Sequence, residues 1–256
     1  MKRVLITGAN GTIGTALREH LGDRYELTAL TRSPADFPSH LGDIVDLDAI
    51  LPAFQGVDSV VHLAATPSVT AEWDEVRDSN LIGVYNVYEA ARRNGVPQVV
   101  FASSNHAVGM YEVDGAPELY ELDDPRVYDH TVPVRPDSLY GASKVFGEAL
   151  GRYYVDRHGL RVICLRIGAV QPGDSPTVGL ALEVDPDRLT VEEQRQRTRA
   201  LWLSQRDCAG LVAAALDADH VTWAVVYGIS DNPRRFYDLS HAREVLGFEP
   251  RDSAPR

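Results

Sequence analysis

The pattern of apolar and polar residues alternates between two kinds of segment along most of the chain. Short runs rich in Val, Ile and Leu predict buried strands, and longer stretches of helical periodicity predict helices. The expected strands cover residues 3–8, 25–31, 59–65, 98–104, 161–168, 223–230 and a short segment before Gly42. The expected helices begin near Thr12 or cover residues 73–94 and 139–158. Strand–helix–strand alternation with strands that are apolar throughout predicts an α/β fold, in which helices cover both faces of a parallel sheet.

Two stretches interrupt this alternation. Residues 109–137 are rich in Pro, Asp and Tyr and predict a long surface loop. Residues 171–199 contain "QPGDSP" followed by the charged run "EEQRQRTR". Long insertions after the strands of such sheets usually form the walls of a binding site. We therefore expect a second lobe built from these insertions and the C-terminal part of the chain.

The composition disfavours nucleic acids and membranes as partners. The 256 residues carry a formal net charge of −12, which disfavours a nucleic-acid surface because phosphate binding needs clustered Lys and Arg. No apolar run approaches the roughly 18 residues that span a bilayer, so no membrane partner is expected. Cys164 and Cys208 lie in apolar contexts and are expected to be buried thiols. Because the first strand begins at Arg3, we expect no signal peptide and a cytoplasmic protein, and no metal site is expected.

The segment "TGANGTIG" (7–14) places three glycines between the first strand and the first helix. Gly8 permits a tight turn, Gly11 lets the backbone approach a pyrophosphate, and Gly14 allows close helix packing. The N-terminus of the helix adds amide donors and positive potential. In this context the loop predicts dinucleotide binding rather than a merely structural turn. The residues expected at the cofactor here are Gly8, Asn10, Gly11, Thr12, Ile13 and Gly14.

The end of the second strand decides which dinucleotide is favoured. A carboxylate there would bind the ribose 2′-hydroxyl of NAD and repel the 2′-phosphate of NADP. The chain has Thr31, Arg32 and Ser33 at this point, and a guanidinium flanked by hydroxyls suits a phosphate. We therefore expect NADP to be preferred, with NAD as the alternative if Arg32 is simply an exposed loop residue. After the third strand, Asp43 and Ile44 are expected around the adenine.

The chain contains 25 basic residues, but only Lys2 and Lys144 are lysines, and Lys144 follows Tyr140 by four positions. On a helix, Tyr140 and Lys144 share a face. An ammonium beside a phenol favours the phenolate, so Tyr140 could take a proton from a substrate hydroxyl while a hydride leaves the carbon. The spacing alone is common on helices, but behind a dinucleotide loop it predicts a catalytic pair.

Polar side chains follow the strand that precedes this helix, in "FASSNH" (101–106). Ligands of parallel sheets bind at the carboxyl ends of the strands. Ser104 is the expected donor to the reacting oxygen, and Asn105 and His106 are the expected substrate contacts. The alternative is that these polar groups only cap the turn after the strand.

Together with "HLAA" and "LRIG", these motifs resemble the extended short-chain dehydrogenase/reductase family. The blocks "FASSNHAVG", "LYGASKVFGE", "ALWLSQRDC" and "VYGISDN" resemble a narrower group within it. That group contains the uronate dehydrogenases and the haloarchaeal glucose-6-phosphate and L-arabinose dehydrogenases. The resemblance implies oxidation of a free sugar at C1: the ring hemiacetal becomes a lactone, and a hydride passes to the nicotinamide.

The resemblance also implies roles for individual residues. Tyr140 would be the base, Lys144 its partner and Ser104 the hydroxyl donor. Asn105 and His106 would contact the sugar. The further residues implied at the cofactor are Leu63, Ala64, Ala65, Asn80 and Ile167, and the one implied at the sugar is Ser68.

Arg197 matches an arginine that holds the acidic group of the substrate in uronate dehydrogenases, although residues in a charged run usually lie on a solvated face. Three departures weaken the uronate interpretation. Thr31 stands in place of an acidic residue, Ala169 stands in place of a serine, and the chain stops at Arg256, before the tail of those enzymes ends. An NADP-type loop with a less polar sugar wall suits the L-arabinose type better.

The sequence as a whole predicts a Rossmann-type, doubly wound parallel sheet with a small C-terminal substrate-binding lobe. Residues 1–168 would form the dinucleotide-binding domain with the catalytic helix, and residues 169–256 the substrate lobe with the last strand. The lead hypothesis is an NADP-preferring sugar 1-dehydrogenase. The helices over 73–94 and 139–158 could pair across a two-fold axis in a homodimer, although packing in the core explains their apolar stripes equally well. One alternative is a nucleotide-sugar epimerase or dehydratase, for which the segment after "RIG" looks too short. The other is a non-catalytic dinucleotide sensor, a class that often lacks one of the catalytic pair.

Overall fold

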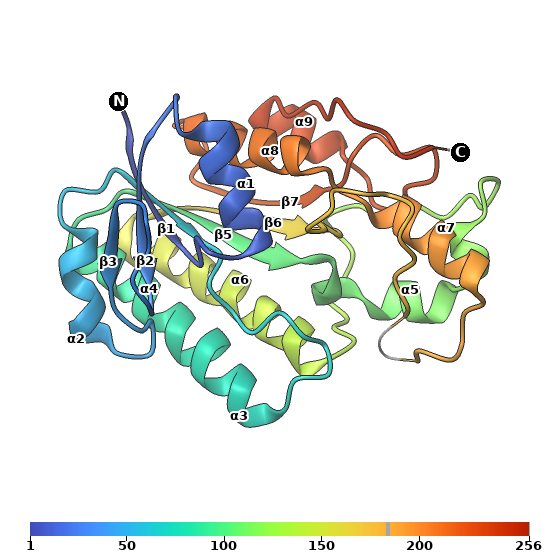
Figure 1. The fold of residues 1–256 in the computed structure, drawn as a ribbon, viewed down its shortest axis with the longest axis horizontal. Coiled ribbons are helices and arrows are strands. Elements are labelled where there is room, and N and C mark those ends of the chain that lie inside the picture. The colour runs from blue at the N-terminus through green and yellow to red at the C-terminus, as the bar shows by residue number, and fades with distance from the viewer. Residues whose placement is uncertain (183–184, 256) are drawn as a thin grey trace.

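The computed structural model describes residues 1–182 and 185–255 and contains a seven-stranded sheet in which neighbouring strands are parallel (Figure 1). The strands are β1 (Arg3–Thr7), β2 (Glu26–Thr31), β3 (Ser39–Leu41), β4 (Ser59–His62), β5 (Gln98–Ser104), β6 (Arg161–Ile167) and β7 (Trp223–Gly228). Their order across the sheet is β3-β2-β1-β4-β5-β6-β7, so the winding reverses between β1 and β4. The predicted Rossmann-type, doubly wound fold is confirmed.

Helices cover both faces of this sheet (Figure 1). They are α1 (Thr12–Leu21), α2 (Leu47–Ile50), α3 (Trp73–Val76), α4 (Gly83–Arg93), α5 (Met110–Gly115), α6 (Leu139–His158), α7 (Val191–Leu201), α8 (Gln205–Asp217) and α9 (Ser240–Leu246). On one face α1, α8 and α9 enclose a core that includes Leu17 and the buried thiol of Cys208. On the other, α2, α4 and α6 pack around Tyr88, Phe101 and the second buried thiol, Cys164. None of the helices in the described ranges combines the length and hydropathy needed to cross a bilayer.

Helix α6 is held against β5 by close packing and by well-defined ends. The side chain of Ser138 caps the N-terminus by accepting a backbone hydrogen bond, and Gly159 ends the helix in the left-handed conformation with φ of 71°. A Cβ at Gly147 would lie 2.3 Å from the ring of Phe101, so only glycine permits this approach. The bounds Leu139–His158 agree with the prediction, and the helix carries the predicted catalytic pair over the carboxyl end of β5.

The predicted helix over 73–94 is present but irregular. α3 and α4 are joined by a π-helical turn, η2 (Arg77–Ile82), and such turns are frequent at functional sites. Asn80 lies in this turn and is buried. Its side-chain amide donates to Ser143 Oγ of α6 at 3.0 Å, and its Oδ1 accepts from the Thr66 amide at 2.8 Å. The turn therefore ties the loop after β4 to α6.

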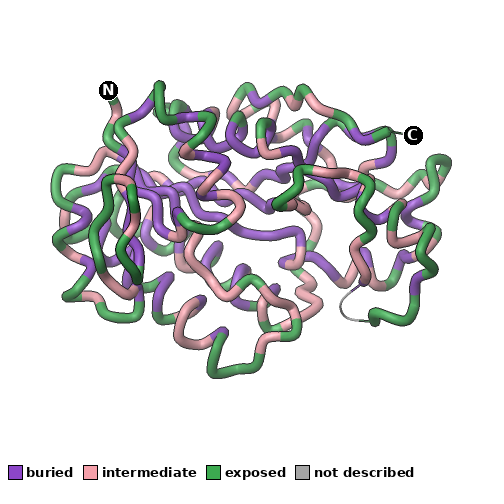
Figure 2. The backbone as a smooth tube through the Cα atoms, in the orientation of Figure 1, coloured by how far each residue is buried: buried purple, intermediate pink, exposed green. Residues whose placement is uncertain are grey.

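The prediction of a surface loop over 109–137 is wrong for the first part of that segment. The chain there forms α5 and a 3-10 turn, η4 (Glu118–Tyr120), and it buries Glu112, Leu119 and Tyr120. Leu119 and Tyr120 belong to a third core cluster, which they share with α7 and the segment after β7. Figure 2 shows buried stretches on this side of the molecule as well as along the central sheet. The partners are distant in sequence, so the local excess of Pro, Asp and Tyr concealed the packing.

The charged run near the end of the 171–199 segment lies on α7. This helix buries Arg197 and Thr198 along with its apolar residues, so the run is not only a solvated face. A capping box formed by Thr190 and Glu193 begins the helix. Residues 183–184 of the predicted wall lie outside the described residues.

Candidate active site

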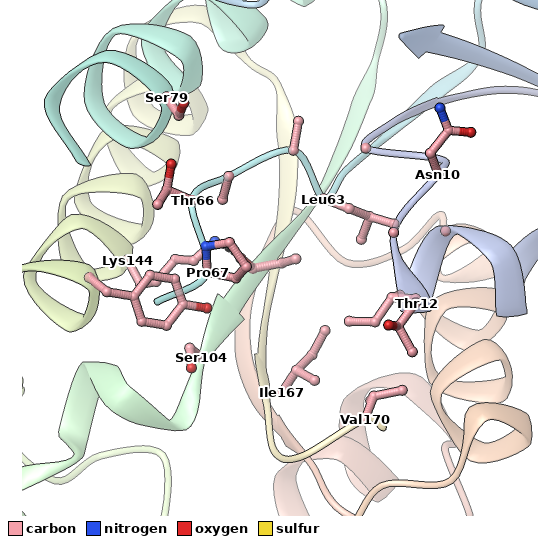
Figure 3. Close-up of a pocket in the computed structure, with 18 of the residues that line it drawn as sticks. Asn10, Thr12, Leu63, Thr66, Pro67, Ser79, Ser104, Lys144, Ile167 and Val170 are labelled. Carbon is pink, nitrogen blue, oxygen red and sulfur yellow. Dashed lines mark hydrogen bonds between the residues drawn. The ribbon is translucent and has the colours of Figure 1, made fainter. Parts of the chain in front are cut away.

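A cavity of about 850 Å³ opens at the carboxyl ends of β1, β4, β5 and β6, beside the point where the strand order reverses (Figure 3). Asn10 and Thr12 lie on one side of it, on the glycine loop and the start of α1. On the opposite side, Ser104 ends β5 and Lys144 projects from α6, while Ile167 closes the cavity from β6. Ligands of doubly wound sheets bind at this crevice.

The glycine loop is shaped to receive a phosphate group. Gly8 has φ of 76°, and a Cβ at Gly14 would lie 2.5 Å from the Cα of Ala9, so neither position accepts a larger residue without strain. At Gly11 a Cβ would meet only the Gly8 carbonyl oxygen, at 3.4 Å, and it would otherwise occupy the space above the loop. No side chain caps the N-terminus of α1, which leaves its first amides for an anion. These residues fit the pyrophosphate of a dinucleotide.

The far end of the cavity is lined by residues that follow β2 and β3. Thr31 is buried and donates its hydroxyl hydrogen bond to the Ser33 carbonyl oxygen at 2.8 Å, while the side chains of Arg32 and Ser33 are exposed. Asp43 accepts a hydrogen bond from a backbone amide, and Ile44 is buried against α4. All five residues line the cavity, as expected for the adenosine end of a cofactor site.

Lys144 lines the cavity although it is only 4% exposed. Its Nζ donates to the carbonyl oxygen of Ala102 at 2.8 Å. The same nitrogen lies 5.4 Å from the centre of the Tyr140 ring and 5.2 Å from that of Phe101. Burial lowers the pKa of Lys144 to about 8. The ammonium is therefore close enough to stabilise negative charge on the phenol.

Ser104 and the two residues after it form the other side of this end of the cavity. Ser104 Oγ accepts from the His106 amide at 3.3 Å and donates to Asn105 Oδ1 at 3.4 Å. His106 Nδ1 donates to the carboxylate of Asp137 at 2.6 Å, and its ring meets that of Tyr140 edge to face. The Asp137 contact fixes the hydrogen on Nδ1, so a neutral His106 presents Nε2 as an acceptor.

Arg197 lines the cavity from α7, although its side chain is only 5% exposed. Its Nε and Nη2 donate to the two carboxylate oxygens of Glu112, at 2.7 and 3.4 Å. Its Nη1 donates to the carbonyl oxygen of Ala181 at 3.1 Å. Glu112, on α5, is 1% exposed and also accepts from the Tyr120 hydroxyl at 2.8 Å. The cation expected to bind a substrate anion thus has an internal carboxylate partner.

Two predicted contact residues do not line the cavity. The hydroxyl of Ser68 shares a hydrogen bond with that of Thr70 at 2.9 Å. The side chain of Asn80 is bonded to Thr66 and Ser143 and does not reach the cavity. The predicted residues that the structure brings to the cavity are Gly8, Asn10, Gly11, Thr12, Ile13, Gly14, Thr31, Arg32, Ser33, Asp43, Ile44, Leu63, Ala64, Ala65, Ser104, Asn105, His106, Tyr140, Lys144, Ile167 and Arg197.

The sequence assigned no individual role to several residues that line the cavity. These are Val170, Gln171, Pro172, Leu180 and Leu201. Val170 and its neighbours follow the carboxyl end of β6, which was the available signal. Leu180 comes from the 171–199 segment predicted as a wall, and Leu201 lies just after it; no composition or spacing there distinguishes the residues that face the cavity.

The chain matches the NAD dependent epimerase/dehydratase family over residues 4–171. It is 40% identical to the L-arabinose 1-dehydrogenase (NAD(P)(+)) of Haloferax volcanii, over 99% of this chain and 98% of that protein. It is 38% identical to the NAD-dependent glucose-6-phosphate dehydrogenase of the same organism, over 98% and 94% of the two chains. A solved mutant of the Agrobacterium tumefaciens uronate dehydrogenase, complexed with NAD, is 34% identical with a TM-score of 0.79, covering 99% of this chain and 86% of that one. The similarity therefore extends over nearly the whole length of this chain.

Proposed function

This chain belongs to the NAD dependent epimerase/dehydratase family, and we propose that it oxidises the C1 hemiacetal of a free sugar to the lactone with NAD(P). One observation carries the proposal: Ser104, Tyr140 and Lys144 line the same cavity as the glycine loop. A base, its cationic partner and a hydroxyl donor beside a dinucleotide site suit the oxidation of an alcohol carbon. The two Haloferax relatives are named for glucose 6-phosphate and L-arabinose, neither of which carries a nucleotide, and this supports a substrate without a nucleotide group.

Tyr140 is the proposed general base. Its phenol takes the proton of the C1 hydroxyl, and the Lys144 ammonium, 5.4 Å from the ring centre, stabilises the phenolate that this role requires. The nicotinamide of the bound cofactor supplies the hydride acceptor. Because Lys144 is fixed by Ala102, the ammonium is already in position before substrate binds.

Ser104 is the proposed donor to the reacting oxygen. Its hydrogen bond to Asn105 measures 3.4 Å, longer than the 2.5–3.0 Å typical of a hydroxyl donor, so turning toward a substrate oxygen costs little. Asn105 and His106 lie beside it and can bind further hydroxyls of the ring. The acceptor at His106 Nε2 suits a sugar hydroxyl.

The preferred cofactor is proposed to be NADP, with NAD also accepted. The exposed guanidinium of Arg32, between the hydroxyl residues Thr31 and Ser33, supports a 2′-phosphate at this end of the cavity. The L-arabinose relative is named for both cofactors and the glucose-6-phosphate relative for NAD.

A rate matrix tests the proposed reaction. L-Arabinose, D-glucuronate, D-galacturonate and glucose 6-phosphate are each offered with NADP+ and with NAD+, and reduction is followed by absorbance. We expect one class of sugar to reduce the cofactor, with NADP+ the faster. No reduction by any combination would contradict the proposal and favour an epimerase or a dinucleotide sensor.

A homodimer is proposed through the face formed by η2, α4 and α6. Ile82, Tyr85, Phe146 and Tyr153 are all more than a third exposed on these helices. Exposed apolar residues at this density often mark a protein–protein contact. Light scattering after size exclusion should give twice the mass of the chain, and a monomer at micromolar concentration would contradict the proposal.

A further inference from the structure

Apart from Lys144, two described side chains at the sugar end of the cavity can carry a positive charge, and each of the two has an internal carboxylate partner. Arg197 is paired with Glu112 through both carboxylate oxygens. His106 is bonded to Asp137, whose side chain is 1% exposed. If His106 is neutral, it presents an acceptor; if it is protonated, Asp137 balances its charge. Neither pair contributes a net positive charge to a ligand.

Among the described residues that line this end, Lys144 is the one other cation, and Gln171 is polar but uncharged. Val170, Leu180 and Leu201 face the cavity with apolar side chains. The remaining ammonium, on Lys144, is fixed at the catalytic tyrosine and is the partner of the developing phenolate. A carboxylate or phosphate at the far end of a sugar would therefore lose hydration without gaining an uncompensated cation.

We propose that the substrate is an uncharged aldose, and that Glu112 is the residue that excludes hexuronates and sugar phosphates. The proposal rests on the sugar dehydrogenase function given above and narrows its substrate class. An anion brought next to Arg197 also approaches the Glu112 carboxylate, which accepts hydrogen bonds from Nε and Nη2 of the same guanidinium. The attraction and the repulsion largely cancel, so Arg197 donates to neutral oxygens without selecting for negative charge.

Glu112 is well held in this role. Its carboxylate accepts from Tyr120 as well as from Arg197, and α5 buries it within the segment that contributes to the third core cluster. Moving it aside to make room for a substrate anion would leave a buried carboxylate without its partners, which is strongly unfavourable. The Glu112 carboxylate therefore balances the charge of Arg197 through buried contacts, and no exposed side chain is needed for this.

Matched sugars test the inference. D-Galactose is compared with D-galacturonate, and D-glucose with D-glucuronate and glucose 6-phosphate, since the members of each set differ only at C6. L-Arabinose, which is the galactose ring without C6, is included as a neutral pentose. We expect kcat/KM to favour the neutral member of each set by at least about tenfold. Equal or faster oxidation of the anionic member would overturn the inference alone, whereas no oxidation of any sugar would overturn the proposed function with it.

The variant Glu112→Gln tests the assigned residue. It removes the compensating charge, so the galacturonate-to-galactose ratio of kcat/KM should rise by at least about tenfold. Glu118→Gln, an exposed residue on the adjoining turn, removes the same charge from the surface and should leave the ratio unchanged. A folded E112Q protein with an unchanged ratio would overturn the role of Glu112. If E112Q does not fold, the matched sugars with the unaltered protein decide the substrate class.

Discussion

Replacing Lys144 by methionine removes the ammonium beside Tyr140 and keeps a side chain of similar length in the buried position. The nitrogen lies 5.4 Å from the centre of the Tyr140 ring. With the phenolate charge placed at the ring centre, Coulomb's law with an effective dielectric constant of about 20 gives about 3 kcal/mol in favour of the phenolate. Because 1.4 kcal/mol is about a factor of ten, we expect K144M to lower kcat about a hundredfold at pH 7.

The same substitution should raise stability at pH 7. Burial lowers the pKa of Lys144 from its ordinary value of 10.5 to about 8, which corresponds to about 3 kcal/mol of destabilisation while the lysine is charged. Loss of the hydrogen bond to Ala102 offsets about 1 kcal/mol of this. K144M should therefore be more stable by about 2 kcal/mol, so its loss of activity would not reflect unfolding.

The pH dependence of stability follows from the same pKa. Below about pH 8, Lys144 is protonated in both the folded and unfolded states, and its burial penalty is fully present. Between pH 8 and 10.5 the folded state releases the proton first, so the free energy of unfolding rises with pH through this group. That rise should be absent from K144M.

Initial rates and urea unfolding at several pH values test these statements together. The control is Lys2→Met, because Lys2 is the other lysine of the chain and contacts Gln98 and Asp219 at the opposite end of the sheet. We expect K2M to keep its turnover. Turnover of K144M within about threefold of the unaltered protein would refute the electrostatic account, because about 3 kcal/mol cannot be removed without a larger effect.

Three further substitutions have distinct expected outcomes. Arg32→Ala should raise the KM for NADP+ about tenfold and that for NAD+ far less, because only NADP has a 2′-phosphate; steady-state kinetics with equal changes for both cofactors would argue against the assignment. Gly14→Ala places a Cβ 2.5 Å from the Cα of Ala9, so it should cost about 1–3 kcal/mol in urea unfolding and weaken cofactor binding, and a neutral result would show that α1 can shift. Glu148→Gln leaves the buried Arg166 guanidinium without its countercharge and should cost about 3–5 kcal/mol; an unchanged Tm would contradict this.

The elements around the sheet could be predicted because their signals are local. Strands buried on both faces are continuous apolar runs, so β5 (Gln98–Ser104) has the bounds that the sequence indicated. The helical stretch that the sequence indicated over 139–158 likewise matches α6 (Leu139–His158). The run at 59–65 was predicted too long, since β4 ends at His62 and the chain then turns along the cavity. Residues at the ends of parallel strands converge by topology, which is why the glycine loop, Ser104 and Tyr140 could be assigned to one site.

The remainder depends on contacts between segments that are distant in sequence. Nothing near Glu112 indicates that it would be buried, because its partner Arg197 lies on α7 and their shared environment includes Tyr120. The same long-range packing turned part of a predicted surface loop into α5 and η4. The pairing of Arg197 with Glu112 arises from the fold, so the sequence around Arg197 suggested an anion site and gave no sign of the buried carboxylate beside it.

The proton transfer from the C1 hydroxyl to Tyr140 is the central claim, and the Tyr140→Phe variant tests it most directly. Tyr153→Phe, an exposed position on the same helix, serves as the control. Lactone formation from the best sugar is followed by NMR, and cofactor binding by fluorescence titration. We predict that Y140F loses about a thousandfold in turnover with unchanged cofactor affinity, while Y153F keeps its activity. Lactone formation by Y140F within about tenfold of the unaltered protein would contradict the account.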